Sequence, residues 1–230
     1  MKYPQFLFKL RIKAILKLSR ISNLITLTGV SEALRDVIKA QPSLAKDVLN
    51  TLQNEYYNYP SAVYRILRSI VKVQPSLAKD VLNTFNTALR SNKNDGYSLL
   101  EAYRVLRHIV DDEPSLAKEV LNTFNAALQS NKNHTSSLSE AYKGLIHLVE
   151  AQPSLAKDVL NTFNTALRSN KNDGYSLLEA YRVLRHIVDD EPSLAKEVLN
   201  TFNAALQSNK NHTSSLSEAY KGLIHLVEAQ

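Results

Sequence analysis

Pro75-Ser-Leu-Ala-Lys-Asp-Val-Leu-Asn-Thr-Phe-Asn86 recurs, with small changes, five times in this chain of 230 residues. The first two copies start 33 residues apart and the later ones 39 residues apart, at Pro42, Pro75, Pro114, Pro153 and Pro192. On a larger scale, residues 74–151 and 152–229 are identical and form a tandem unit of 78 residues. Self-similarity at a fixed period of roughly 20–50 residues is typical of repeat proteins. The sequence therefore predicts a solenoid.

Each copy predicts a pair of helices. In the first helix, Pro75 stands in the first turn, where its missing N–H costs nothing. Apolar residues then recur at helical spacing, at Leu77, Ala78, Val81, Leu82, Phe85, Ala88 and Leu89. A polar turn at 91–96 ends in glycine, which permits positive φ. The second helix is expected to begin with a capping box formed by Ser98 and Glu101. Its inner face is expected to consist of Ala102, Val105, Leu106, Ile109 and Val110.

The pairs are expected to stack on one another. A single pair cannot bury its apolar faces, so neighbours must cover them. We therefore predict an all-α, right-handed α-α superhelix of about six helix pairs with 39-residue repeats. A basic, degenerate capping repeat at 1–41 is expected to precede units at 42–74, 75–113, 114–152, 153–191 and 192–230.

The second-helix segments are similar to those of HEAT repeats, in the armadillo/HEAT class. The similarity is carried by the length of the two-helix unit, by Leu100-Glu-Ala-Tyr-Arg-Val-Leu-Arg-His-Ile-Val110 and by Ser139-Glu-Ala-Tyr-Lys-Gly-Leu-Ile-His-Leu-Val149. The family's usual Asp and Arg at the inter-helix turn are not in place, and the polar turn is long. The resemblance implies a curved superhelix whose second helices line a concave, protein-binding side.

A stripe of aromatic and cationic residues is predicted on the second helices, opposite the core. Tyrosine with arginine is the composition of interface hot spots. The candidate binding residues are Tyr64, Arg65, Arg68, Tyr103, Arg104, Arg107, His108, Tyr142, Lys143, His147, Tyr181, Arg182, Arg185, His186, Tyr220, Lys221 and His225. A structural alternative stays open, in which the tyrosines pack beside the core. In that alternative the cations are solvated or neutralised by Asp111, Asp112 and Glu113.

The in-register histidines and asparagines allow further hypotheses. A metal site is disfavoured, because zinc needs ligands at about 2 Å and one His–carboxylate pair is too few. A pH effect is favoured instead, since the four histidines are expected to charge near pH 6. The first helices carry an asparagine ladder at Asn83, Asn86, Asn122, Asn125, Asn161, Asn164, Asn200 and Asn203. Armadillo-type proteins hold peptide backbones with such ladders, but on the concave helix, so that role is not carried across, and composition bias is an equally good explanation. Lys93, Lys132, Lys171 and Lys210 are expected in solvated turns.

Composition and charge bound the remaining possibilities. There is no cysteine, which excludes disulfides and thiolate sites. The net charge of +6 comes entirely from the segment before Glu32. Charges interrupt its apolar runs, which argues against a signal peptide or transmembrane span. The first 28 residues are predicted to form a cap, with a membrane-surface helix or targeting segment as alternatives, and a cytoplasmic location is expected.

The function predicted from these features is a protein-binding scaffold rather than an enzyme. No catalytic constellation interrupts the uniform repeat, and no cofactor or metal is implied. The alternative is a nucleic-acid or anionic-surface binder that uses the basic stripe and the N-terminal segment. Self-association is also expected, through a C-terminal apolar face formed by Phe202, Leu206, Leu223, Leu226 and Val227. The alternative is that the chain is a piece of a longer array.

Overall fold

The protein was analysed as a computed structural model. The structure describes residues 24–52, 60–89, 96–130, 135–169 and 174–208, together with Lys221 and Ile224. Several predictions lie outside the described residues. They concern the N-terminal segment up to residue 23, the polar turns with their lysines, and the last second helix with Tyr220 and His225. The same holds for Leu223, Leu226 and Val227 of the predicted C-terminal face.

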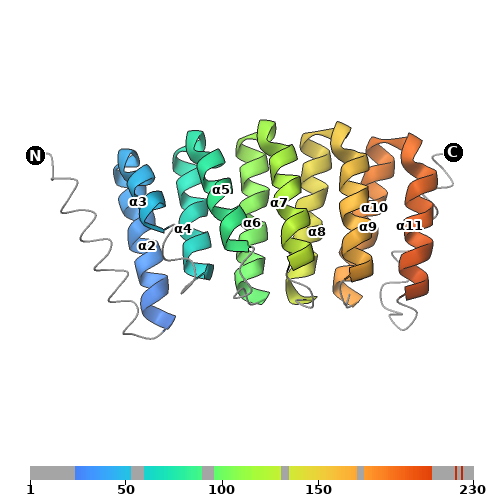
Figure 1. Ribbon diagram of the computed structural model, residues 1–230, viewed down its shortest axis with the longest axis horizontal. Coiled ribbons are helices and arrows are strands. Elements are labelled where there is room, and N and C mark those ends of the chain that lie inside the picture. The colour runs from blue at the N-terminus through green and yellow to red at the C-terminus, as the bar shows by residue number, and fades with distance from the viewer. Residues whose placement is uncertain are drawn as a thin grey trace, which may run out of the picture.

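Helix pairs stand side by side in an elongated stack, with the first helices in one layer and the second helices in another (Figure 1). The first helices of the pairs are α3 (Ala45–Leu52), α5 (Ala78–Leu89), α7 (Ala117–Ser130), α9 (Ala156–Ser169) and α11 (Ala195–Ser208). The second helices are α2 (Leu24–Ala40), α4 (Pro60–Val73), α6 (Gly96–Asp112), α8 (Thr135–Ala151) and α10 (Gly174–Asp190). Each helix packs on its neighbours in the row. The prediction of an all-α helical solenoid is therefore confirmed.

The repeated Pro-Ser-Leu sequence forms the tight link between one second helix and the next first helix. It is a single 3-10 turn in every copy, at Pro42–Leu44, Pro75–Leu77, Pro114–Leu116, Pro153–Leu155 and Pro192–Leu194. The backbone N–H of Gln74 donates to Ile70 at 2.8 Å, and the N–H of Leu77 donates to Gln74 at 3.0 Å. Proline suits this place because its φ is preset and no N–H is needed. The predicted first-turn position of the prolines is confirmed.

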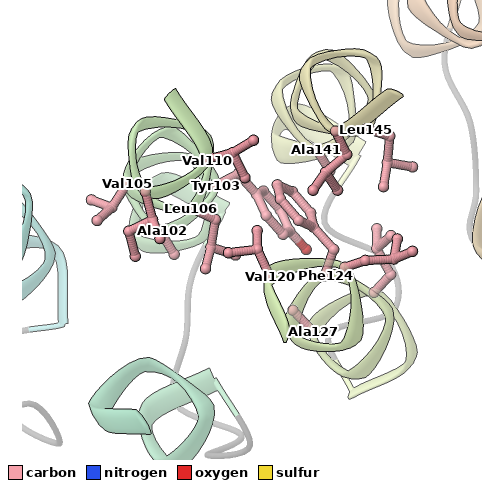
Figure 2. Packing of buried hydrophobic residues seen from close by; sticks show 14 of the residues in the cluster. Ala102, Tyr103, Val105, Leu106, Val110, Val120, Phe124, Ala127, Ala141 and Leu145 are labelled. Carbon is pink, nitrogen blue, oxygen red and sulfur yellow. The ribbon is translucent and has the colours of Figure 1, made fainter. Parts of the chain in front are cut away.

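The core is built around an aromatic pair at each junction between repeats. The Phe124 ring of α7 lies between α6 and α8 and stacks on Tyr103 of α6, with centroids 5.4 Å apart and an angle of 7° (Figure 2). The pairs at the other junctions are Tyr64–Phe85, Tyr142–Phe163 and Tyr181–Phe202. All eight rings are fully buried, or at most 2 % exposed. Each pair therefore joins one repeat to the next.

This burial decides the place of the tyrosines. Of the two interpretations, an exposed stripe opposite the core and packing beside the core, the structure supports the second, because the rings of Tyr64, Tyr103, Tyr142 and Tyr181 are part of the core. The tyrosine rings are buried because the phenylalanine of the next repeat's first helix packs against each of them. This contact forms only when the helix pairs stack. Burial also raises the pKa of the Tyr103 hydroxyl above its ordinary value. These rings stabilise the junctions and do not belong to an exposed surface.

A glycine makes room for one of these phenylalanines. A Cβ placed on Gly144 of α8 would lie 2.3 Å from Cζ of Phe124 and 2.9 Å from its Cε1. Real Cβ atoms do not approach other atoms this closely. Gly144 stands at the position that Val105 occupies in the preceding 39-residue repeat, so the close approach of Phe124 gives this difference a steric reason.

The row is tighter on one side than on the other. Consecutive second helices approach one another much more closely than consecutive first helices do. The second-helix side is the one predicted to be concave. We therefore call the surface of the second helices the concave surface and that of the first helices the outer surface.

The start of the second helices differs from the prediction. α6 begins at Gly96, two residues before the expected cap, so that Ser98 lies inside the first turn. Ser98 and Glu101 are both buried, with 2 % and 5 % of their surface exposed. Glu101 points its carboxylate at arginine side chains, as described below. The Ser–x–x–Glu pattern was therefore given the wrong role.

Candidate binding surface

The concave surface retains the charged part of the predicted stripe and loses the aromatic part. Arginine, lysine and histidine side chains of α4, α6, α8 and α10 are half-buried or exposed there. They are Arg65, Arg68, Arg104, Arg107, His108, Lys143, His147, Arg182, Arg185 and His186. Lys221 is exposed as well. The tyrosines between them belong to the core, so any partner on this surface meets charges first.

A ladder of buried glutamates lies beneath these cations. Glu101, Glu140 and Glu179 occupy equivalent positions on α6, α8 and α10 and are only 5 %, 8 % and 3 % exposed. A buried carboxylate is costly unless it is paired. Within their own helices, Glu101 accepts from Arg104 at 3.1 Å, and Glu179 accepts from Arg182 at 2.9 Å. The glutamates therefore neutralise much of the stripe from below.

The same glutamates connect one repeat to the next. Glu140 accepts a hydrogen bond from the Arg107 guanidinium of the preceding repeat at 2.9 Å. Arg104 reaches the same carboxylate at 3.8 Å. In the preceding junction, Arg65 lies 3.8 Å from Glu101. Positive and negative side chains thus alternate along the concave surface from α4 to α8.

Sequence reasoning missed this ladder. It expected Asp111, Asp112 and Glu113 to neutralise the cations and assigned the glutamates to helix caps. The available signal was the Glu-x-x-Arg spacing of Glu101 and Arg104, which places both on one helix face. The contact to the neighbouring repeat could not be found this way, because its geometry depends on how the two helices pack.

One groove on the concave surface has a charge excess. It has a volume of about 420 Å³ and lies over α2, α4 and α6. Six basic and two acidic side chains line it, a net charge of +4. The charged residues are Arg35, Lys39, Arg65, Arg68, Lys72 and Arg104, with Glu32 and Glu101. The volume falls within the usual range of ligand clefts, roughly 300–1,000 Å³.

The excess arises because α4 departs from the repeat. Ala62 stands where the later second helices have their buried glutamate, so α4 contains no acidic residue. Three residues before the proline, Lys39 and Lys72 stand where later repeats have Asp111, Glu150 and Asp189. Within the described residues, no carboxylate forms an ion pair with Arg68, Lys39 or Lys72. The groove is therefore a specific feature of the first repeats.

The histidines are coupled through one carboxylate. Nδ1 of His108 lies 3.7 Å from Asp111, and Nδ1 of His147 lies 3.4 Å from the other oxygen of the same side chain. His147 is also 3.5 Å from Glu150. Such distances suit ion pairs and exceed metal–ligand bonds of about 2 Å. Among the described residues, no group of three His, Asp or Glu side chains is arranged to hold a metal ion.

His108 resists protonation. Burial lowers its pKa below the ordinary 6.5, and the charges of Arg68 and Arg107 lower it further against the opposing effect of Asp111 and Asp112. Its Nε2 is buried and has no hydrogen-bond partner in the described part of the chain. His108 therefore takes up a proton at a lower pH than an unperturbed histidine does.

We expect His108→Gln to flatten the pH dependence of stability between pH 7.5 and about 5, above the range where most carboxylates titrate. The unfolded chain takes up a proton at His108 near pH 6.5, whereas the folded chain does so only at lower pH. Unfolding therefore becomes easier as the pH falls, and the full stability is present only above pH 6.5. Thermal melts of both proteins at stepped pH measure this. Parallel curves would contradict the prediction.

The outer surface has a different chemistry. Thr123 of α7 donates a hydrogen bond to the side-chain oxygen of Asn86 of α5 at 2.9 Å, which gives one asparagine of the ladder a structural role. Lys118 and Asp158 form an ion pair between α7 and α9. Two hollows of about 210 and 200 Å³ lie between first helices and are lined largely by asparagine and threonine. Neither has the charge excess of the concave groove.

No protein-family model and no curated protein sequence matches this chain. None of the described helices is long and apolar enough to cross a membrane.

Proposed function

We propose that this protein is a binding scaffold of the HEAT-like type, which uses its concave surface to hold another protein. The observation that carries the proposal is the +4 groove of about 420 Å³ on that surface. The glutamate ladder supports it, because side chains that are tied to a neighbouring repeat form a preorganised surface and lose less freedom on binding. We also propose that the protein acts by binding and not as an enzyme. We propose a reducing compartment, such as the cytoplasm, as its location.

The alternative partner is a nucleic acid or another polyanion. The basic groove is the observation that favours it, since Lys and Arg contacts to phosphates dominate such binding. The short extent of this positive charge argues against a nucleic acid. Beyond α4, the row that begins with Lys39 and Lys72 becomes acidic at Asp111, Glu150 and Asp189. A long phosphate backbone that followed the concave surface would meet these carboxylates.

Site-specific photo-crosslinking tests the proposal. A photoreactive amino acid is placed at Ser69 or Arg182 on the concave surface, and at Asn83 or Asn161 on the outer surface as the matched controls. In an extract of the source cells, we expect discrete adducts from the concave positions only. The mass added in these adducts should be resistant to nuclease. Adducts from the outer positions alone would overturn the concave assignment, and nuclease-sensitive adducts would favour the alternative.

A further inference from the structure

The geometry points to an acidic, extended segment of a protein partner as the ligand of the groove over α2, α4 and α6. This inference rests on the proposed function and adds the chemical class of the ligand. Part of the positive charge in the groove is not neutralised by the protein itself, although Arg35 pairs with Asp36 at 3.2 Å and Glu101 pairs with Arg65 and Arg104. Arg68 is half-buried and Lys72 is exposed, and neither forms an ion pair within the described part of the chain. Free carboxylates are the natural complement of such a site.

The groove is arranged so that its cations project from successive helices. Arg35 of α2 and Arg68 of α4 stand at equivalent positions, seven residues before the proline of each repeat. Lys39 and Lys72 form a second equivalent pair, one helical turn further along. Helices that pack side by side are about 8–10 Å apart. Two parallel rows of positive charge with this spacing therefore cross the groove.

A chain in an extended, polyproline-like conformation matches this spacing. It advances about 3.1 Å per residue and turns once every three residues, so that every third side chain points the same way about 9 Å further on. An acidic residue at every third position would therefore place carboxylates against consecutive helices. Arginine can bind such a carboxylate with two parallel hydrogen bonds.

One wall of the groove is held in place before any ligand arrives. The Arg65 guanidinium donates a hydrogen bond to the Tyr97 hydroxyl and lies 5.5 Å from the centre of that ring. Tyr97 is 52 % exposed, one of the few large apolar side chains that reach the surface among the described residues. It stands beside the groove and offers a flat ring to the apolar parts of a peptide. The apolar part of a peptide gains from such a contact.

The neighbouring charges favour a short acidic segment over a nucleic acid. On α6 the surface beyond the groove carries Asp111 and Asp112, and on α8 it carries Glu150. These carboxylates would repel a phosphate backbone that extends past α6. A local acidic stretch of a protein ends within the groove and avoids them. The charge boundary between Lys72 and Asp111 thus limits the length of the ligand.

The direct test uses a labelled peptide of about nine residues, which spans roughly 28 Å when extended, with glutamate at every third position and proline between. The matched control peptide has glutamine in place of glutamate. Fluorescence anisotropy at physiological salt measures the affinity of the full chain for each. We expect the glutamate peptide to bind at least about tenfold more tightly, as the loss of charge-assisted hydrogen bonds predicts. Equal affinity for the two peptides would overturn the inference.

Two variants of equal charge locate the site. Arg68→Glu/Lys72→Glu reverses the free cations of the groove, and Lys46→Glu/Lys79→Glu reverses two exposed lysines on the neighbouring first helices. Both change the net charge by the same amount, so long-range attraction is matched. We expect the first variant to lose about tenfold or more in affinity and the second to change it by less than about twofold. Circular dichroism confirms that both variants fold. Equal losses in the two variants would overturn the site.

A single-stranded oligonucleotide of the same charge as the peptide forms the third arm. We expect it to bind more weakly than the glutamate peptide. If it binds more tightly and loses this affinity in the groove variant, the ligand carries phosphates and the inference is overturned. Peptide binding without concave photo-crosslinks would count against the proposed function alone. Concave photo-crosslinks without any preference for the glutamate peptide would count against the inference alone.

Discussion

Phe124→Ala is expected to lower the free energy of unfolding by about 3–5 kcal/mol, the usual cost of truncating a buried phenylalanine. The ring is fully buried between α6 and α8, and it stacks on Tyr103. Its removal leaves a cavity at the junction of two repeats, where nothing else fills the space. The loss should be measured by urea unfolding, followed by circular dichroism.

Two further measurements make this prediction specific. Each repeat contacts only its neighbours, so the loss should be felt first in α6, α7 and α8. Hydrogen exchange should therefore accelerate in these helices before it does in α3. Phe124→Leu keeps most of the apolar volume and should cost clearly less. A loss below about 1 kcal/mol for Phe124→Ala would show that the ring does not join the repeats as described.

Gly144→Ala is expected to destabilise the protein by about 1–2 kcal/mol, although alanine is the better helix former. The new Cβ would lie 2.3 Å from Phe124, and the buried ring has little room to move. Overpacking of this kind costs about 1–3 kcal/mol and exceeds the gain of about 0.5–1 kcal/mol from replacing a helical glycine. Urea unfolding of the variant measures the net effect.

The chain supplies a matched control for this substitution. Gly29 lies inside α2, where an added Cβ would meet nothing within 4 Å. Gly29→Ala should therefore stabilise the protein by about 0.5–1 kcal/mol, with the opposite sign. The double variant Phe124→Leu/Gly144→Ala should lose less unfolding free energy than the sum of the losses in the two single variants, because the smaller Leu side chain relieves the clash. Stabilisation by Gly144→Ala would contradict the close packing of this junction.

The glutamate ladder explains why the later arginines are poorer candidates for partner contacts than Arg68. Arg107 is held at 2.9 Å by Glu140 of the next repeat, and its side chain is only 25 % exposed. A partner that binds Arg107 must compete with this carboxylate. Arg68 stands at the equivalent position of α4, but the carboxylate of the next repeat, Glu101, pairs with Arg65 and Arg104 instead. The departure of one repeat from the pattern thus concentrates the available charge at one place.

The sequence by itself determined the repeat length, the helix pairs and the proline turns. These features depend on interactions over a few residues, such as the fixed φ of proline at Pro75 and the helical spacing of Leu82 and Phe85. The apolar faces also followed from periodicity, since a helix must bury one side. The capping-box prediction was wrong, because the spacing of Ser98 and Glu101 fits more than one role. Glu101 has the spacing of a cap, but its carboxylate accepts from Arg104 of its own helix at 3.1 Å and lies 3.8 Å from Arg65 of the preceding repeat.

Only the tertiary structure decided which of the in-register residues are buried and which are free. Tyr103 lies at the edge of the apolar face of its helix, and it is buried because the ring of Phe124 from the next repeat stacks on it. Glu140 becomes neutralised because Arg107 reaches it across the packed pair α6 and α8. Such contacts depend on the distance and angle between helices from different repeats, which local spacing does not encode. The groove beside Arg68 exists for the same reason, since it lies between three second helices rather than on any one of them.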